Sequence, residues 1–306
     1  MPTIKFMNKR GQRGVNMLRK FIKKMKSTGK QGWPRELRVR LNSFQEWNEF
    51  YHGHRFLNDP AYLEFLVGEI SSQGLACPFH QRHIAPSDII LCAPNYREGI
   101  LAAGLNSRLR AVVLEMNRAM DGKAPGDICI YAPEAVTHFA LLLRGRYARF
   151  IGSEFTTEPV VKQGLFPIQF ESLLELSFSD ALFDAVVIND VFEHVPDIDR
   201  CLSEICRVTK PGGSLITTFP FAISSYDSVI KAKMNAGKIE YLTEPEYHGN
   251  PVDPKGSLVF EIPGWNILER VRAAGWSSAE IVYEHSVEHG IVGGGVSGIF
   301  TMVAVR

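Results

Sequence analysis

The chain has 306 residues, of which 45% are hydrophobic and 22% charged, a composition typical of a globular protein with a sizeable core. Its longest apolar runs, such as residues 185–188, are far shorter than the ~20 residues of a membrane-spanning helix. The five cysteines are an odd number and lie mostly in apolar stretches. They favour free thiols in a reducing compartment over a disulfide framework, so a cytoplasmic location is expected.

The net charge of +1 conceals a strong asymmetry. Residues 1–45 carry thirteen Lys or Arg and one acid, a net charge of +12, whereas the remainder has a net charge of −11. We call residues 1–43 the basic segment. Within it, apolar residues at helical spacing (Val15, Leu18, Ile22 and Met25) predict a basic amphipathic helix.

Two interpretations of the basic segment stay open. It could bind an anionic membrane surface or an acidic partner, which would place the protein peripherally at the membrane. Alternatively, it could be a solvated helix that folds over the rest of the chain. Nucleic acid is a weaker candidate, because the remainder is acidic and carries no recognition motif.

The next region, residues 44–125, is expected to be helical and irregular. Helices are predicted at 44–50, 61–70 and 108–120, with irregular chain between Cys77 and Asn106.

Residues 126–306 alternate strands and helices, the pattern of a mostly parallel sheet with helices on both faces. This α/β pattern predicts a Rossmann-like sheet of seven strands, the last antiparallel, preceded by the helical and irregular extension. Residues 220–263 form an ordered insertion after the fifth strand. Strands are expected at 127–132, 149–154, 167–170, 183–189, 214–219, 279–283 and 298–305, and helices at 134–143, 157–163, 197–209 and 265–274.

The most informative motif is in residues 183–196, which read Phe-Asp-Ala-Val-Val-Ile-Asn-Asp-Val-Phe-Glu-His-Val-Pro. An amphipathic helix follows, and Pro211-Gly212-Gly213 then opens another strand. This block resembles class I S-adenosylmethionine-dependent methyltransferases of the ubiquinone-biosynthesis type. The resemblance covers roughly residues 126–306 and is tightest over 170–220. It implies S-adenosylmethionine as the cofactor and methyl transfer as the reaction.

The cofactor is expected beyond the carboxyl ends of the parallel strands, where open α/β sheets bind their ligands. Asn189 and Asp190 follow a buried strand at that edge. Glu154 closes the second strand and is placed to accept from the ribose hydroxyls. The resemblance puts Glu171 near the adenine and Ser172 beside it. The expected cofactor-binding residues are Tyr131, Glu134, Glu154, Glu171, Ser172, Asn189 and Asp190.

The turn after the first strand departs from the family pattern. Tyr131, Ala132, Pro133 and Glu134 stand where a glycine-rich turn is usual. A dinucleotide needs glycines there for close approach of its pyrophosphate, so an NAD-dependent reductase ranks last. S-adenosylmethionine has no phosphate, and Glu134 could meet its amino group.

The acceptor is expected to bind near the insertion, because Tyr247 and His248 lie there in a stretch rich in Pro and Gly. His248 or His194 could act as a general base for a hydroxyl or acid. The expected catalytic residues are therefore His248, His194 and Tyr247. O-methylation of a small molecule, glycan or peptide is inferred by analogy with similar folds.

A second resemblance concerns Cys77, His80 and Cys92, which look like part of a zinc knuckle that precedes some of these domains. A closed zinc site needs four ligands, and residues 98–104 lack the expected Cys pair. The prediction is a degenerate knuckle without metal, with no metal ligands elsewhere. Together with the glycine-free turn, it leaves open a catalytically degenerate binding or scaffold module as the alternative to an enzyme.

Overall fold

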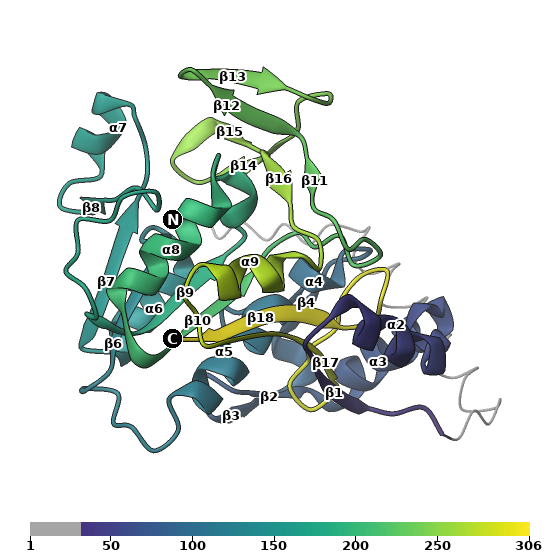
Figure 1. Ribbon diagram of the computed structural model, residues 1–306. Coiled ribbons are helices and arrows are strands. Elements are labelled where there is room, and N and C mark those ends of the chain that lie inside the picture. The colour runs from purple at the N-terminus through teal and green to yellow at the C-terminus, as the bar shows by residue number, and fades with distance from the viewer. Residues whose placement is uncertain (1–31) are drawn as a thin grey trace, which may run out of the picture.

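The computed structural model describes residues 32–306, and its centre is an eight-stranded sheet (Figure 1). The strand order is β1-β17-β18-β10-β9-β6-β7-β8. Neighbours from β10 to β8 are parallel, β18 is antiparallel to both of its neighbours, and β1 is antiparallel to β17. The strands are β1 (Glu36–Leu41), β6 (Cys129–Ala132), β7 (Arg149–Glu154), β8 (Gln169–Phe170), β9 (Phe183–Asn189), β10 (Thr209–Thr218), β17 (Ser278–Ser286) and β18 (Ile299–Val305).

Helices cover both faces of this sheet (Figure 1). Helices α8 (Ile198–Val208) and α9 (Ile267–Ala273) lie on one face, and α5 (Ser107–Ala119) and α6 (His138–Arg146) lie on the other. The starts of α6 and α8 are fixed by side-chain caps, since Thr137 accepts from Ala140 N and Asp197 accepts from Arg200 N. The remaining helices are α2 (Phe44–Gly53), α3 (Pro60–Gln73), α4 (Tyr96–Gly99) and α7 (Pro159–Gly164). No helix within residues 32–306 is long and apolar enough to cross a bilayer.

The predicted Rossmann-like fold is confirmed, with one correction to its strand count. Residues 36–41 form an eighth strand, β1, at the edge of the sheet. The basic segment therefore does not extend to residue 43 as a separate arm. Leu37, Val39 and Leu41 alternate with Glu36, Arg38 and Arg40, the period of a strand with one buried face. The amphipathic helix predicted over residues 15–25 lies outside the described residues.

The region 44–125 shares its core with the sheet. Trp47 of α2 and Leu66 of α3 belong to the same buried cluster as Val187 of β9. Two small hairpins, β2 (Leu75–Cys77) with β3 (Arg82–Ile84) and β4 (Ile89–Leu91) with β5 (Ile100–Ala102), replace much of the irregular chain expected there. This region is an extension packed on the sheet, with no core of its own.

The insertion at residues 220–263 is built from three two-stranded sheets that stand beyond the end of β10 (Figure 1). Strand β14 (Tyr247–Asn250) pairs with β15 (Asp253–Leu258), and this hairpin carries His248. The others pair β11 (Val229–Ile230) with β16 (Glu261–Ile262) and β12 (Ala232–Asn235) with β13 (Lys238–Tyr241).

Candidate functional site

The loop between β6 and α6 is tied directly to the end of β9. Glu134 Oε2 accepts from Asn189 N at 2.8 Å and from Asn189 Nδ2 at 3.1 Å. The sequence had predicted a helix from residue 134. Helix α6 begins only at His138, so Glu134 lies in the loop that precedes it. Burial raises the pKa of Glu134 from 4.5 to about 7, although Arg108 and the Asn189 donors oppose this shift. Glu134 and Asn189, each predicted to contact the cofactor, are thus hydrogen bonded to each other.

Glu154, at the end of β7, points toward the same loop. It is 6% exposed, and its Oε1 accepts from Val136 N at 2.9 Å. Burial raises the pKa of this carboxyl, and the Val136 donor opposes the shift. The loop passes close to β7, since a Cβ on Gly152 would lie 3.1 Å from Ala135 Cβ. Gly152 on the neighbouring strand therefore permits close packing of the loop against β7.

Tyr131 was expected to contact the cofactor, and the structure contradicts this. Its side chain is fully buried, stacks on Phe183 at 5.2 Å between ring centroids and meets Phe178 edge-on at 5.0 Å. Its hydroxyl is hydrogen bonded to Ser153 Oγ at 2.8 Å. Strand β6 is buried on both faces, so the Tyr131 side chain packs in the core against Phe178 and Phe183.

Glu171 is also used differently from the prediction. Its carboxylate accepts from Ser177 N, from Ser177 Oγ and from Gln169 Nε2, at 2.5 to 2.8 Å. These contacts close the turn at residues 172–177, so both carboxylate oxygens of Glu171 already accept hydrogen bonds within the protein. Ser172 lies in the same turn, and its Oγ accepts from Leu174 N at 3.3 Å. A contact between Ser172 and the cofactor stays a prediction.

Asp190 is held by two arginines that the sequence analysis did not single out. Its carboxylate pairs with Arg97 at 2.6 and 2.8 Å and with Arg108 at 3.3 Å. Although burial opposes ionisation, Arg108 and Arg97 lower the pKa of Asp190. Glu98 pairs with the same two arginines. Asp190 thus anchors the segment around α4 over the strand ends, and its contact with the cofactor stays a prediction.

The backbone of Asp190 has a φ of +53°, a conformation uncommon for residues other than glycine. Its N–H donates to Thr218 O at 2.8 Å, which fixes this turn to the end of β10. Strained backbone of this kind concentrates at functional sites.

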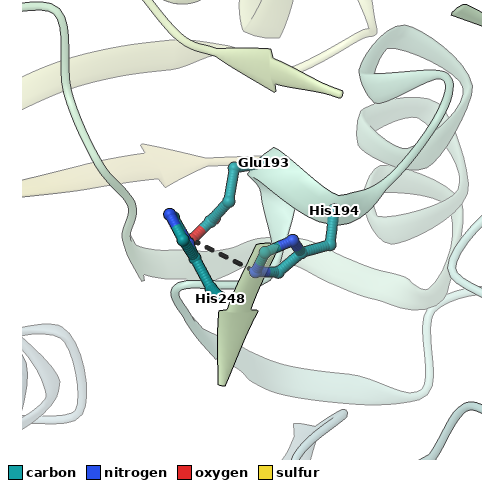
Figure 2. A group of neighbouring side chains, drawn as sticks. All are labelled: Glu193, His194 and His248. Carbon is teal, nitrogen blue, oxygen red and sulfur yellow. Dashed lines mark ion pairs between the residues drawn. The ribbon is translucent and has the colours of Figure 1, made fainter. Parts of the chain in front are cut away.

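Two of the three predicted catalytic residues come together, and they do so with a buried acid. Figure 2 shows His194, from the turn Phe192–His194 after β9, and His248, from β14, on either side of Glu193. His194 Nε2 and His248 Nδ1 each lie 3.6 Å from Glu193 Oε1. Burial lowers the pKa of His194, and the Leu258 carbonyl opposes this shift.

Tyr247 does not join this group. It is 52% exposed, and a hydrogen bond with Tyr241 raises the pKa of its hydroxyl. Residues 247 and 248 are neighbours on β14, and successive side chains of a strand point to opposite faces. Since His248 faces Glu193, Tyr247 faces away from this group, and its expected role at the acceptor stays a prediction.

The zinc-knuckle resemblance is not supported. Cys77 Sγ lies 3.2 Å from His80 Nδ1, but Cys92 is exposed and joins no ligand group with them. Arg110 is fully buried in this region and donates to the carbonyls of Ile100, Leu105, His289 and Gly290. The guanidinium thus links residues 100 and 105, which were expected to belong to the knuckle, to residues 289 and 290.

A cavity of about 460 Å³ lies at the same edge of the sheet. Trp47, Tyr51 and His52 of α2 line one side, and Ile223 and Val296 line another. Ile223 follows the end of β10, and Val296 precedes β18, whose antiparallel course starts at that edge. Its aromatic and polar lining suits an organic ligand.

The fold and the strand-end acids define the class of protein: a Rossmann-like α/β protein with its ligand edge at β6, β7 and β9. Residues 137–217 match the family model described as a methyltransferase domain. This match to a methyltransferase domain agrees with the resemblance that the motif at 183–196 had indicated.

Curated relatives share only part of their length with this chain. A demethylmenaquinone methyltransferase of Thermobifida fusca (strain YX) is 33% identical over 110 residues, 34% of this chain and 45% of that protein. A ubiquinone/menaquinone biosynthesis C-methyltransferase of Brucella anthropi is 45% identical over 62 residues, 19% of this chain and 24% of that protein. The chain thus spans less than half the length of these two relatives.

A solved structure of an S-adenosylmethionine-dependent methyltransferase from Mesorhizobium loti is 14% identical, with a TM-score of 0.40. The match covers 64% of this chain and 98% of that one.

The residues at the strand ends fit S-adenosylmethionine, the cofactor of this class. Asn189 Oδ1 is buried without a hydrogen-bond partner, so an acceptor is left for a ligand donor. Glu154 uses one oxygen for Val136, and a carboxylate can accept further hydrogen bonds. Asn189 and Glu154 both contact the β6–α6 loop. Glu134, the acidic residue of this loop, is half-buried.

Proposed function

We propose that this protein transfers a methyl group from S-adenosylmethionine to a hydroxyl group of a small molecule, glycan or peptide. The observation that carries the proposal is the buried Glu154 carboxylate beside the β6–α6 loop. When bound, the sulfonium supplies an electrophilic methyl group: the acceptor oxygen bonds to that carbon, the carbon–sulfur bond breaks with its electron pair on sulfur, and the hydroxyl proton is released. The protein's task is then to align the two reactants and exclude water.

Each residue has a distinct part in this proposal. Glu154 accepts from the ribose hydroxyls, and Asn189 Oδ1 accepts from a second donor of the cofactor. Glu134 sets the position of the loop through Asn189, and the ion pairs of Asp190 hold the segment around α4 over the site. His194 and His248 stand on the acceptor side.

The acceptor class follows from the two histidines. Imidazole can receive the proton that a hydroxyl loses, whereas an amine nucleophile needs no such base when it is already neutral. The relatives' names point to quinones and to C-methylation, so a ring carbon is the competing acceptor atom. The aromatic wall of the cavity suits the apolar part of either acceptor.

Cofactor binding is tested by calorimetric titration of the full chain with S-adenosylmethionine and S-adenosylhomocysteine. Glu154→Ala should weaken binding at least tenfold, because the ribose loses its carboxylate. Glu158→Ala is the matched control, since Glu158 is exposed and caps nothing. Absence of heat from the wild type would favour the non-catalytic scaffold.

Transfer itself is tested with methyl-labelled donor and fractionated cell extract, followed by mass determination of the labelled product. A methyl ether supports the proposal. A label on a ring carbon, or binding of the donor without any transfer, contradicts it.

Residues 1–31 contain ten Lys or Arg and no Asp or Glu. We also propose that these basic side chains bind the protein to an anionic membrane surface. This would make it a cytoplasmic protein peripheral to the membrane. Each basic side chain near such a surface contributes about 1 kcal/mol.

A further inference from the structure

Three hydrogen-bond acceptors converge where the turn after β9 meets the insertion. Glu193 Oε1 lies 3.6 Å from His194 Nε2 and 3.6 Å from His248 Nδ1 (Figure 2). The three ligand atoms all lie within 4.8 Å of one another. His248 is 54 positions from His194 in sequence, so the β14–β15 hairpin is what completes the group.

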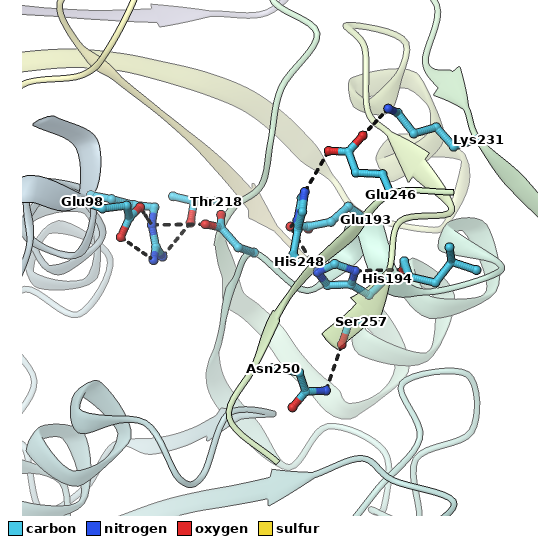
Figure 3. Close-up of polar contacts among 12 residues, drawn as sticks. Glu98, Glu193, His194, Thr218, Lys231, Glu246, His248, Asn250 and Ser257 are labelled. Atoms are coloured by element: carbon cyan, nitrogen blue, oxygen red, sulfur yellow. Dashed lines mark hydrogen bonds and ion pairs between the residues drawn. The ribbon is translucent and has the colours of Figure 1, made fainter. Parts of the chain in front are cut away.

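The outer nitrogen of each histidine is already engaged (Figure 3). His194 Nδ1 is 2.9 Å from Leu258 O, and a carbonyl can only accept, so that nitrogen carries the hydrogen. His248 Nε2 is 3.1 Å from Glu246 Oε1, and the Lys231 ammonium binds the other oxygen of Glu246. Each neutral ring therefore presents its bare nitrogen toward Glu193.

Glu193 has no other partner to satisfy it. Its side chain is fully buried, and neither carboxylate oxygen has a hydrogen-bond partner. Two bare imidazole nitrogens and a buried carboxylate thus face one another with no hydrogen-bond donor between them, a set of lone pairs that a metal cation can satisfy.

We propose that Glu193, His194 and His248 bind a divalent transition-metal ion. Two imidazoles and one carboxylate are a common ligand set for zinc at catalytic sites, where a further position stays open. Two ligand atoms, each about 2.1 Å from one ion and about 110° apart, are roughly 3.4 Å apart, close to the observed 3.6 Å. The outer hydrogen bonds to Leu258 O and Glu246 are the second-shell arrangement that metal-binding histidines adopt.

This site also refines the proposed function, on which the next step rests. Glu193, His194 and His248 would hold the ion, which would supply Lewis-acid chemistry that lowers the pKa of an acceptor hydroxyl. The histidines would then act as ligands, and the hydroxyl proton would be released to solvent instead of to an imidazole. Glu193 and His194 follow Asn189 by only a few residues, so the ion stands beside the cofactor edge. The substrate class is therefore an acceptor whose hydroxyl can bind a metal.

Metal binding is measured on the full chain without any cofactor. Apoprotein prepared by chelation is titrated with Zn²⁺ and with Mn²⁺, and bound metal is counted by elemental mass spectrometry. One equivalent is expected for the wild type. His248→Ala should weaken binding at least a hundredfold, and since His248 lies on a half-exposed hairpin the core should stay folded. His83→Ala, at an exposed histidine of β3, should bind as the wild type does.

Two further measurements distinguish a folding defect from the loss of a metal-binding side chain. Co²⁺-loaded wild type should show visible d–d absorption that changes in Glu193→Gln, whose circular dichroism should stay unaltered. S-adenosylhomocysteine affinity should be the same in His248→Ala and in the wild type. Equal metal affinity in wild type and His248→Ala, or no binding by the wild type, overturns the site.

The metal site and the methyl transfer can fail independently. Metal binding without methyl transfer contradicts the proposed function and leaves the site intact. Methyl transfer that is unaffected by chelation and unaffected in His248→Ala removes the metal from the reaction.

Discussion

The carboxylate of Glu134 receives both the main-chain N–H and the side-chain amide of Asn189, so one acid closes the gap between the ends of β6 and β9. Arg108 and Asp190 are the charged groups that face it, and they act on its pKa in opposite directions. This bond fixes the loop that stands where a glycine-rich turn is usual, and it gives that loop a dependence on pH.

Glu134→Gln should remove a pH dependence of stability. Burial raises the pKa of Glu134 from 4.5 to about 7 in the folded chain, so the folded state holds a proton that the unfolded state has lost between these values. This contribution is therefore complete below pH 4.5 and is lost as the pH rises through 7, by at most about 3 kcal/mol. Urea unfolding at pH 5 and pH 8 measures it. If wild type and variant change equally between the two pH values, the shift at Glu134 is absent.

His285→Phe should act in the opposite pH direction. His285 Nε2 lies 2.7 Å from the Tyr62 hydroxyl, which donates to Pro34 O, and the ring is fully buried beside Tyr283. Burial lowers the pKa of His285 from 6.5 to about 4, and the Pro34 carbonyl opposes this shift. The unfolded chain binds this proton first, so stability falls as the pH drops from 6.5 toward 4.

The His285→Phe variant should lose this acid sensitivity, worth about 3 kcal/mol, while the Tyr62 hydroxyl keeps Pro34 as its acceptor. Thermal unfolding at pH 4.5 and 6.5 compares the two proteins, with exposed His83→Phe as the control. A wild type whose melting temperature does not fall more than that of His285→Phe contradicts the prediction.

Buried strands were the part of the fold that sequence patterns predicted well. Strand β9 has the predicted bounds, because its central apolar run, residues 185–188, is buried on both faces. Edge strand β1 was missed, although residues 36–41 alternate regularly. Its Arg38 and Arg40 are neutralised by Glu115, Glu284 and Glu280 on α5 and β17, partners that a single sequence does not reveal.

The candidate site divides in the same way. Glu154 and Asn189 end β7 and β9 as expected, whereas their contact with a cofactor stays a prediction. The predicted cofactor contact of the Tyr131 side chain was wrong, because the sequence of a strand that is buried on both faces does not indicate which way each side chain points. His248 and Glu193 meet only through the fold of the β14–β15 hairpin, which the sequence indicated as an ordered loop without a register.

Removal of residues 1–31 should abolish binding to anionic vesicles if the basic segment binds membranes. The truncation at residue 32 removes ten basic residues and keeps β1, whereas a cut at residue 44 would also remove an edge strand. Co-sedimentation with vesicles containing phosphatidylserine compares both chains at low and high salt. Salt should release the full chain, because surface electrostatics are screened. Equal pelleting of both chains ends the membrane interpretation.

Arg110→Met should destabilise the fold by about 2–4 kcal/mol. The guanidinium donates to four main-chain carbonyls, at distances from 2.6 to 3.0 Å, and no carboxylate pairs with it in the part of the chain described. Burial lowers the pKa of Arg110 to about 9, because a charge is unfavourable in this apolar surrounding. Loss of the buried charge offsets part of the effect, but the carbonyls lose charge-assisted hydrogen bonds in a buried place. Exposed Arg82→Met is the control for urea unfolding.

Gly290→Ala tests the same arrangement from the other side. Gly290 has a φ of +63°, and a Cβ at this position would lie 2.5 Å from Leu75 Cδ2 and 3.2 Å from Arg110 Nη2. The added methyl group strains the backbone and presses on the guanidinium, so a loss of at least about 1 kcal/mol is expected. Because both substitutions act on one contact, the double variant should lose less than the sum of the two. Full additivity would show that Gly290 and Arg110 act separately.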